Sequence, residues 1–152
     1  QLGAFGQRSR RGFGSLELTS RSWKTNEEFI DSISKLLNDL GKETDPQQNK
    51  IITSTDRDFD FPVLRSIEIA GKFSNYKEAL NAIGNASSQV KHKYNFIMGH
   101  FNPRRASPLH ATVKKIDDAF VVVVTEIRQK SLKRMGPKYK EAKDLFIRLV
   151  NK

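Results

Sequence analysis

The stretch that most constrains the fold is LHATVKKIDDAFVVVVTEIR, residues 109–128. Its second half holds the longest apolar run of the chain, Ala119 to Val124, which includes four consecutive valines. Valine restricts χ1 and favours an extended backbone, so this run predicts a strand. Because no polar residue alternates with the valines, we expect both faces of the strand to be covered, as in the middle of a sheet.

The first half of the stretch alternates, which predicts a partner strand for the valine run. Apolar residues at 109, 111 and 113 share one face, and the polar residues between them share the other. A tight turn at 117–118 joins the two strands, although it lacks the glycine that favours such turns. The expected hairpin register places Ile116 opposite Ala119 and His110 opposite Thr125.

The pattern elsewhere predicts three helices. Thr25 and Glu28 have the spacing of a capping box, and an apolar stripe then runs to Gly41, a suitable C-terminal cap. Asn75 is the expected N-cap of a second helix that ends in basic residues at 91–93. Pro137 is placed for the first turn of a third helix.

Further strands are expected at 15–22, 50–55, 63–73 and 94–98, with an exposed loop at 42–49. The offset of Leu64 from the other apolar residues of the 63–73 strand indicates a kink there. Together these elements predict an α+β fold: a two-layer domain with an antiparallel or mixed sheet of about five to six strands, packed by two or three helices.

Length and composition place this fold in one domain. The chain has 152 residues, and we expect a flexible basic arm at 1–15 followed by a single domain at 16–152. Cysteine is absent, which excludes disulfides, thiolate metal sites and cysteine nucleophiles, and favours a reducing compartment such as cytoplasm, an organelle matrix or a virion. No apolar run approaches the roughly 20 residues of a membrane span, so no membrane partner is expected.

The positive charge is concentrated in particular segments. The net charge is +10, yet residues 25–90 carry more acids than cations. Residues 91–115 hold six cations and no acid, and residues 128–143 form a second basic segment. We call these the first and second cationic blocks. A charge distribution of this kind is typical of proteins that bind polyanions, and it predicts nucleic acid as the partner.

The arm and one loop supply the residue types that suit this partner. The arm, QLGAFGQRSRRGFGS, mixes arginine with phenylalanine and has no acid, although it also fits an ordinary mobile terminus or the remnant of a targeting segment. The loop at 99–108 adds a phenylalanine and paired arginines, which suit base stacking and phosphate contacts. The expected nucleic-acid contacts are Arg8, Arg10, Arg11, Phe101, Arg104, Arg105, Lys114, Lys115, Arg128, Lys130, Lys133 and Arg134.

Two other chemistries have partial signatures in the sequence. A metal-independent ribonuclease needs a base, an acid and cations around the phosphate, which His100 and His110 with Arg104 and Arg105 would supply. The alternating acids at 56, 58 and 60 resemble the start of a calcium loop, but its glycine and terminal glutamate are missing. We therefore expect no metal and no cofactor.

The sequence favours a non-enzymatic nucleic-acid-binding domain that works within a larger ribonucleoprotein or virion-like assembly. RNA is favoured over DNA because no helix rich in base-reading side chains is visible, whereas arginine and aromatic residues in loops suit single strands. The first alternative is the toxin-like ribonuclease. The second is a structural assembly subunit, from a capsid or a secretion apparatus, whose basic arm contacts neighbouring protein subunits.

Overall fold

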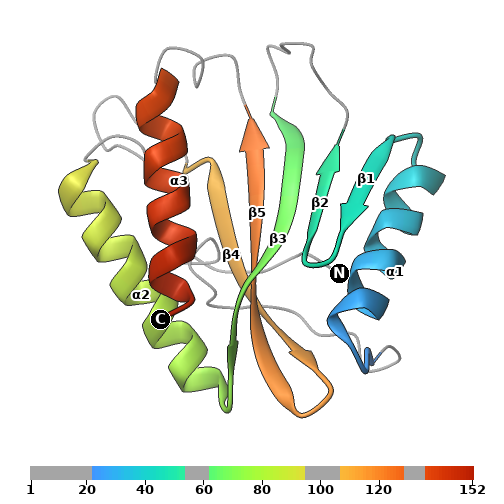
Figure 1. The fold of residues 1–152 in the computed structure, drawn as a ribbon, viewed down its shortest axis with the longest axis horizontal. Coiled ribbons are helices and arrows are strands. Elements are labelled where there is room, and N and C mark those ends of the chain that lie inside the picture. Colours follow the sequence, from blue (N-terminus) through green and yellow to red (C-terminus); the bar gives the residue numbers. More distant parts are fainter. Residues whose placement is uncertain (1–21, 54–61, 95–106, 129–135) are drawn as a thin grey trace.

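The structure is a computed structural model that describes residues 22–53, 62–94, 107–128 and 136–152 (Figure 1). These residues form three helices and a five-stranded antiparallel sheet, which confirms the α+β prediction. In chain order the elements are α1 (Asn26–Asp39), β1 (Thr44–Gln47), β2 (Lys50–Thr53), β3 (Val63–Phe73), α2 (Tyr76–Lys93), β4 (Leu109–Ile116), β5 (Ala119–Arg128) and α3 (Gly136–Val150). All but one residue of each strand expected at 15–22 and at 94–98 lies outside the described residues, as do the alternating acids at 56–60.

The strand order is β1-β2-β3-β5-β4, so the valine strand β5 lies between two neighbours, as predicted. The β4–β5 hairpin also has the predicted register, with Ile116 opposite Ala119 and His110 opposite Thr125. Asp117 takes a left-handed backbone conformation, with φ of 53°, which provides the sharp turn without a glycine. Its amide also donates a hydrogen bond to the carbonyl of Trp23, 2.7 Å away.

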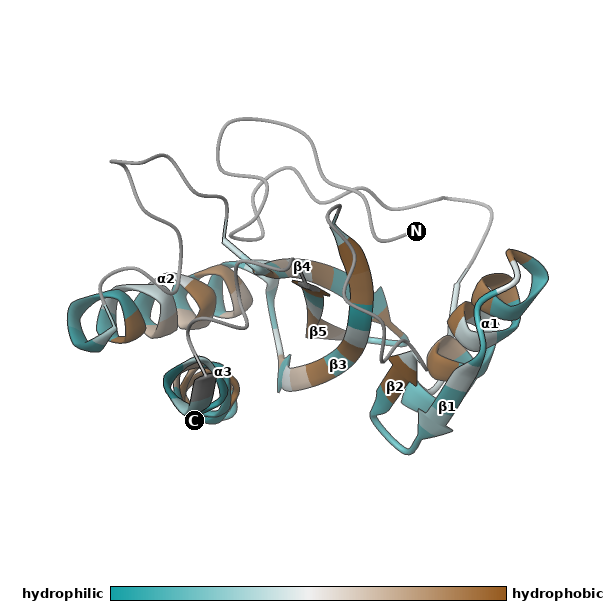
Figure 2. Cartoon of the chain, turned by 90° about the horizontal axis from the view of Figure 1, so that it is seen from above, coloured by the Kyte–Doolittle hydropathy of each residue, from teal (hydrophilic) through white to brown (hydrophobic). Residues whose placement is uncertain are grey.

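Both faces of β5 are buried, and they contribute to two different cores. Val122 and Val124 pack with residues of α2 and α3, whereas Val121 and Val123 pack with residues of α1. Figure 2 shows the corresponding layers, with α2 and α3 on one face of the curved sheet and α1 on the other. Helix α1 therefore adds a layer beyond the two that the sequence pattern predicted.

The prediction of a loop at 42–49 is wrong in part, because this segment contains strand β1 and a tight connection to β2. Pro46 made the segment look irregular, since proline lacks the amide that a ladder needs. Among the described strands β1 lies at the edge of the sheet, and a proline is tolerated at such a position because only one side of the strand needs ladder hydrogen bonds. The kink predicted in β3 is present as a register shift between Leu64 and Ser66 opposite β5.

The predicted helix caps are confirmed. The hydroxyl of Thr25 accepts a hydrogen bond from the amide of Glu28 at 3.1 Å, and the carboxylate of Glu28 accepts one from the amide of Lys24 at 2.8 Å. Asn75 caps α2 by accepting from the amide of Glu78 at 2.9 Å. Gly41 follows α1 with φ of 73°, a conformation that favours glycine.

Because of the cap of α2, we expect the free energy of unfolding to depend slightly on pH. Hydrogen bonds from Ser74 and then Asn75 lower the pKa of Glu78 below its ordinary value of 4.5. A carboxyl with a lowered pKa stabilises the fold above its unfolded pKa, and this contribution disappears as the pH falls through the folded pKa. We expect Glu78→Gln to lower the urea midpoint slightly at pH 7 and to match the unaltered protein near pH 3. Equal urea midpoints at pH 7, or a difference that persists at pH 3, would contradict this account.

Candidate functional site

The described residues that flank segments 95–106 and 129–135, which belong to the two cationic blocks, lie at one end of the domain. Helix α2 ends there, β4 begins, β5 ends and α3 begins, at the upper end in Figure 1. Backbone contacts fix this arrangement, since the amide of Ile127 donates to the carbonyl of Pro108 at 2.8 Å. Segments 95–106 and 129–135 are therefore both attached at this end, although they come from opposite sides of the hairpin in the sequence.

Exposed cations of the described residues lie at the same end. We define the basic end as Lys91 and Lys93 of α2 together with Lys138 and Lys140 of α3, all of which are exposed. Next to them, the hydroxyl of Tyr94 donates to the carboxylate of Glu141 at 3.1 Å and so joins the end of α2 to the start of α3. The ammonium of Lys93 lies 5.4 Å from the centre of the Tyr94 ring. The two helix ends thus form one cationic surface.

Two of the predicted contact residues lie away from this surface. Lys114 and Lys115 are next to the hairpin turn, at the end of β4 opposite the basic end, about 17 and 20 Å along the strand from Leu109. Their side chains point to opposite faces of the sheet. Lys114 is only 3% exposed and lies on the α1 side, whereas Lys115 is exposed. The fold therefore does not bring all cations of the first cationic block onto one surface.

The other predicted residues cannot be placed in the same way. Arg128 is described through its backbone, which pairs with Val63. His110 is half-buried on β4. The boundary predicted between arm and domain lies outside the described residues. So do the remaining predicted site residues, which are Arg8, Arg10, Arg11, His100, Phe101, Arg104, Arg105, Lys130, Lys133 and Arg134.

The structure also contains a groove that sequence reasoning missed. It runs along α3, between this helix and strands β2 and β3, and has a volume of about 540 Å³. Its lining comes from four elements far apart in the chain, so no local spacing could have indicated it. The charged residues that line it are Lys50, Lys140, Lys143 and Arg148 with Glu68, Glu126 and Asp144.

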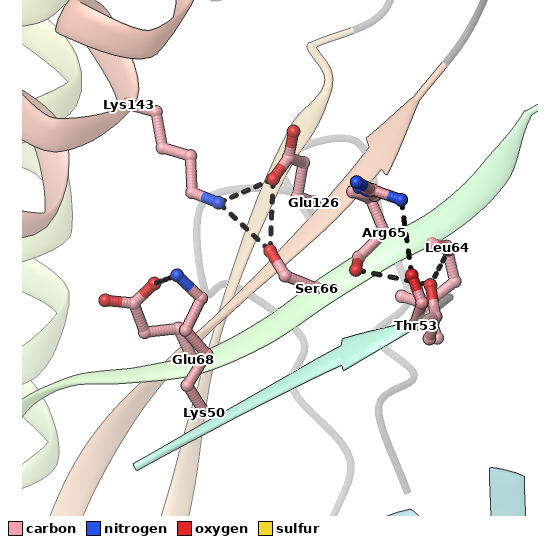
Figure 3. A network of polar contacts seen from close by, with 8 residues as sticks. All are labelled: Lys50, Thr53, Leu64, Arg65, Ser66, Glu68, Glu126 and Lys143. Carbon is pink, nitrogen blue, oxygen red and sulfur yellow. Dashed lines mark hydrogen bonds and ion pairs between the residues drawn. The ribbon is translucent and has the colours of Figure 1, made fainter. Parts of the chain in front are cut away.

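Some of these charges pair with one another at the base of the groove (Figure 3). The ammonium of Lys143 lies 2.5 Å from the carboxylate of Glu126 and donates to the hydroxyl of Ser66 at 3.0 Å. That hydroxyl in turn donates to Glu126 at 3.0 Å. The Lys143 and Glu126 side chains are only 12% and 5% exposed, so this three-residue network is largely buried. On the opposite wall, Lys50 pairs with Glu68 at 3.5 Å.

The buried network does not have the chemistry of a nucleophilic site. A serine next to a lysine is used in some hydrolases, where a neutral amine removes the proton of the hydroxyl. Here Lys143 donates a hydrogen bond to the hydroxyl of Ser66 instead of accepting one from it, and this hydroxyl donates to Glu126. Ser66 itself is only 3% exposed. The network therefore serves to connect α3 to β3 and β5.

The described residues contain neither a cluster of metal-ligand side chains nor a helix that could span a membrane. No group of three or more His, Asp or Glu side chains in these residues is arranged to hold a metal ion. The described helices include none that is both long enough and apolar enough to span a bilayer. Comparisons with protein-family models, with curated proteins and with solved structures gave no match.

Proposed function

We propose that the chain is a non-enzymatic nucleic-acid-binding domain, with RNA favoured over DNA, that works within a larger ribonucleoprotein or virion-like assembly. The observation that supports this most is the basic end, where exposed lysines of α2 and α3 lie beside the attachment points of two cationic segments. Ammonium groups gathered on one surface neutralise several phosphates at once, and the release of counterions then drives binding.

The kind of contact favours RNA or another single strand. The exposed cations of the basic end that the structure describes are lysines, which act as point charges and position a phosphate backbone without reading its bases. Base contacts would then come from aromatic and arginine side chains of the arm and of segment 95–106. Stacking of this kind needs bases that are not already paired, which single-stranded RNA provides.

Charge reversal at the basic end tests the proposal. We expect Lys91→Glu with Lys93→Glu to weaken binding of a labelled single-stranded RNA by at least about tenfold at about 0.1 M salt. The dependence of log K on log salt should become shallower by about 1.4, because each phosphate contact on a single strand contributes about 0.7 to the slope. Fluorescence anisotropy measures both quantities.

The matched control is Lys35→Glu with Lys42→Glu. This variant makes the same change in net charge around α1, on the other face of the sheet. It should bind RNA within about twofold to threefold of the unaltered protein, because distant exposed charges are screened within about 10 Å at 0.1 M salt. An equal loss in both variants would show that only net charge matters and would overturn the assignment to the basic end. Thermal unfolding of both variants checks that they remain folded.

A further inference from the structure

We propose that the groove along α3 holds one unpaired nucleotide of the bound strand and prefers a base that carries an amino group over uracil. This inference rests on the proposed function and adds a base preference to it. The groove volume of about 540 Å³ lies within the range of small-ligand sites, which is roughly 300–1,000 Å³, and is too small for a duplex.

The phosphate side of the site is formed by Lys140 and Arg148. Both residues line the groove, both are exposed, and neither forms an ion pair with a described residue. They lie eight residues apart on α3, about 12 Å along the helix axis, with Asp144 midway between them. Lys140 also belongs to the basic end, so a strand held there continues directly into the groove.

The base side of the site is formed by Glu68 and Ile147 on the two walls. One carboxylate oxygen of Glu68 lies 3.5 Å from the ammonium of Lys50, and Figure 3 shows the other oxygen pointing away from Lys50. Ile147 offers an apolar side chain for the face of a base. Lys143 and Glu126 form an ion pair with each other at the bottom of the groove. The carboxylate of Glu68 is therefore the group that contacts the edge of the nucleobase.

The chemistry of this carboxylate determines which base it accepts. An ionised carboxylate can only accept hydrogen bonds, and the exocyclic amino group of cytosine is a donor that suits it. Uracil presents a carbonyl oxygen at the same position, so two acceptors would face each other without a proton between them. Cytosine and uracil have nearly the same size and shape, and a comparison between them therefore isolates the contribution of the amino group.

Labelled octamers of cytidylate and uridylate test the inference at pH 7.5, with affinity measured by fluorescence anisotropy. We expect the cytidylate octamer to bind about fivefold to tenfold more tightly, since one specific base contact contributes about that much discrimination. Glu68→Gln should abolish the preference, because an amide can turn its NH₂ toward the uracil carbonyl. Glu27→Gln, an exposed carboxylate on α1, is the control and should keep the preference.

The outcomes separate this inference from the proposed function. Equal binding of the two octamers, or a preference that survives in Glu68→Gln, would overturn the base site while leaving nucleic-acid binding intact. The path through the groove would be overturned if Lys140→Glu with Arg148→Glu leaves the affinity unchanged while Lys91→Glu with Lys93→Glu lowers it. Nucleic-acid binding at the basic end would then still stand. Failure of both octamers to bind at low salt would overturn the proposed function as well.

Discussion

Replacing Lys143 by methionine should destabilise the domain by about 3–5 kcal/mol. The substitution removes the ammonium that pairs with the carboxylate of Glu126, a side chain that is only 5% exposed. Removing one partner of a buried ion pair destabilises a protein far more than the intact pair stabilises it. Domains of this size have a total free energy of unfolding of about 5–15 kcal/mol, so a large part of the stability would be lost. Urea unfolding measures it.

A double variant shows whether the buried charge is the cause. Lys143→Met with Glu126→Gln removes both charges, and the amide of glutamine can still accept from Ser66. We expect the double variant to recover most of the stability that the single variant loses. If the double variant is as unstable as Lys143→Met alone, the loss comes from packing of the lysine side chain rather than from the buried carboxylate.

Placing an aspartate at either face of the valine strand should unfold or nearly unfold the domain. Val122 and Val123 are both fully buried, the first against α2 and α3 and the second on the α1 side. A charge in either core has no partner, so Val122→Asp and Val123→Asp should each cost more than about 4 kcal/mol. Circular dichroism and urea unfolding measure the loss.

The comparison between the two substitutions tests the layered arrangement. A sheet covered on one face only would tolerate one of them, because adjacent residues of a strand point to opposite faces. Lys115→Asp, an exposed position on the neighbouring strand, is the control and should change stability by much less. Native-like stability of either valine variant would contradict the assignment of a helix layer to that face.

The parts of the fold that depend on local chemistry were predictable. Four valines without an alternating polar residue indicated a strand covered on both faces, and Thr25 and Asn75 indicated where two helices begin. Strand β1 was missed because Pro46 is read as a breaker unless the strand is known to be at an edge. The position of α1 on the second face was not predictable, since a helix stripe shows which side packs but not against which face of the sheet.

The candidate site was likewise predictable only in part from the sequence. The cationic blocks are visible in the sequence, and the antiparallel topology then brings two of their segments to one end of the domain. Lys114 and Lys115 belong to the first block by sequence, but β4 carries them to the opposite end. The groove along α3 depends on residues from β2, β3, β5 and α3, and only the three-dimensional structure brings these together.

The salt dependence of RNA affinity tests the central claim most directly. A labelled single-stranded RNA is titrated with the full chain at a series of salt concentrations from about 50 to 200 mM. We predict that log K falls linearly with log salt, with a slope of about −3 or steeper, which corresponds to four or more phosphate contacts. Absence of binding at the lowest salt, or an affinity that does not change with salt, would contradict the account.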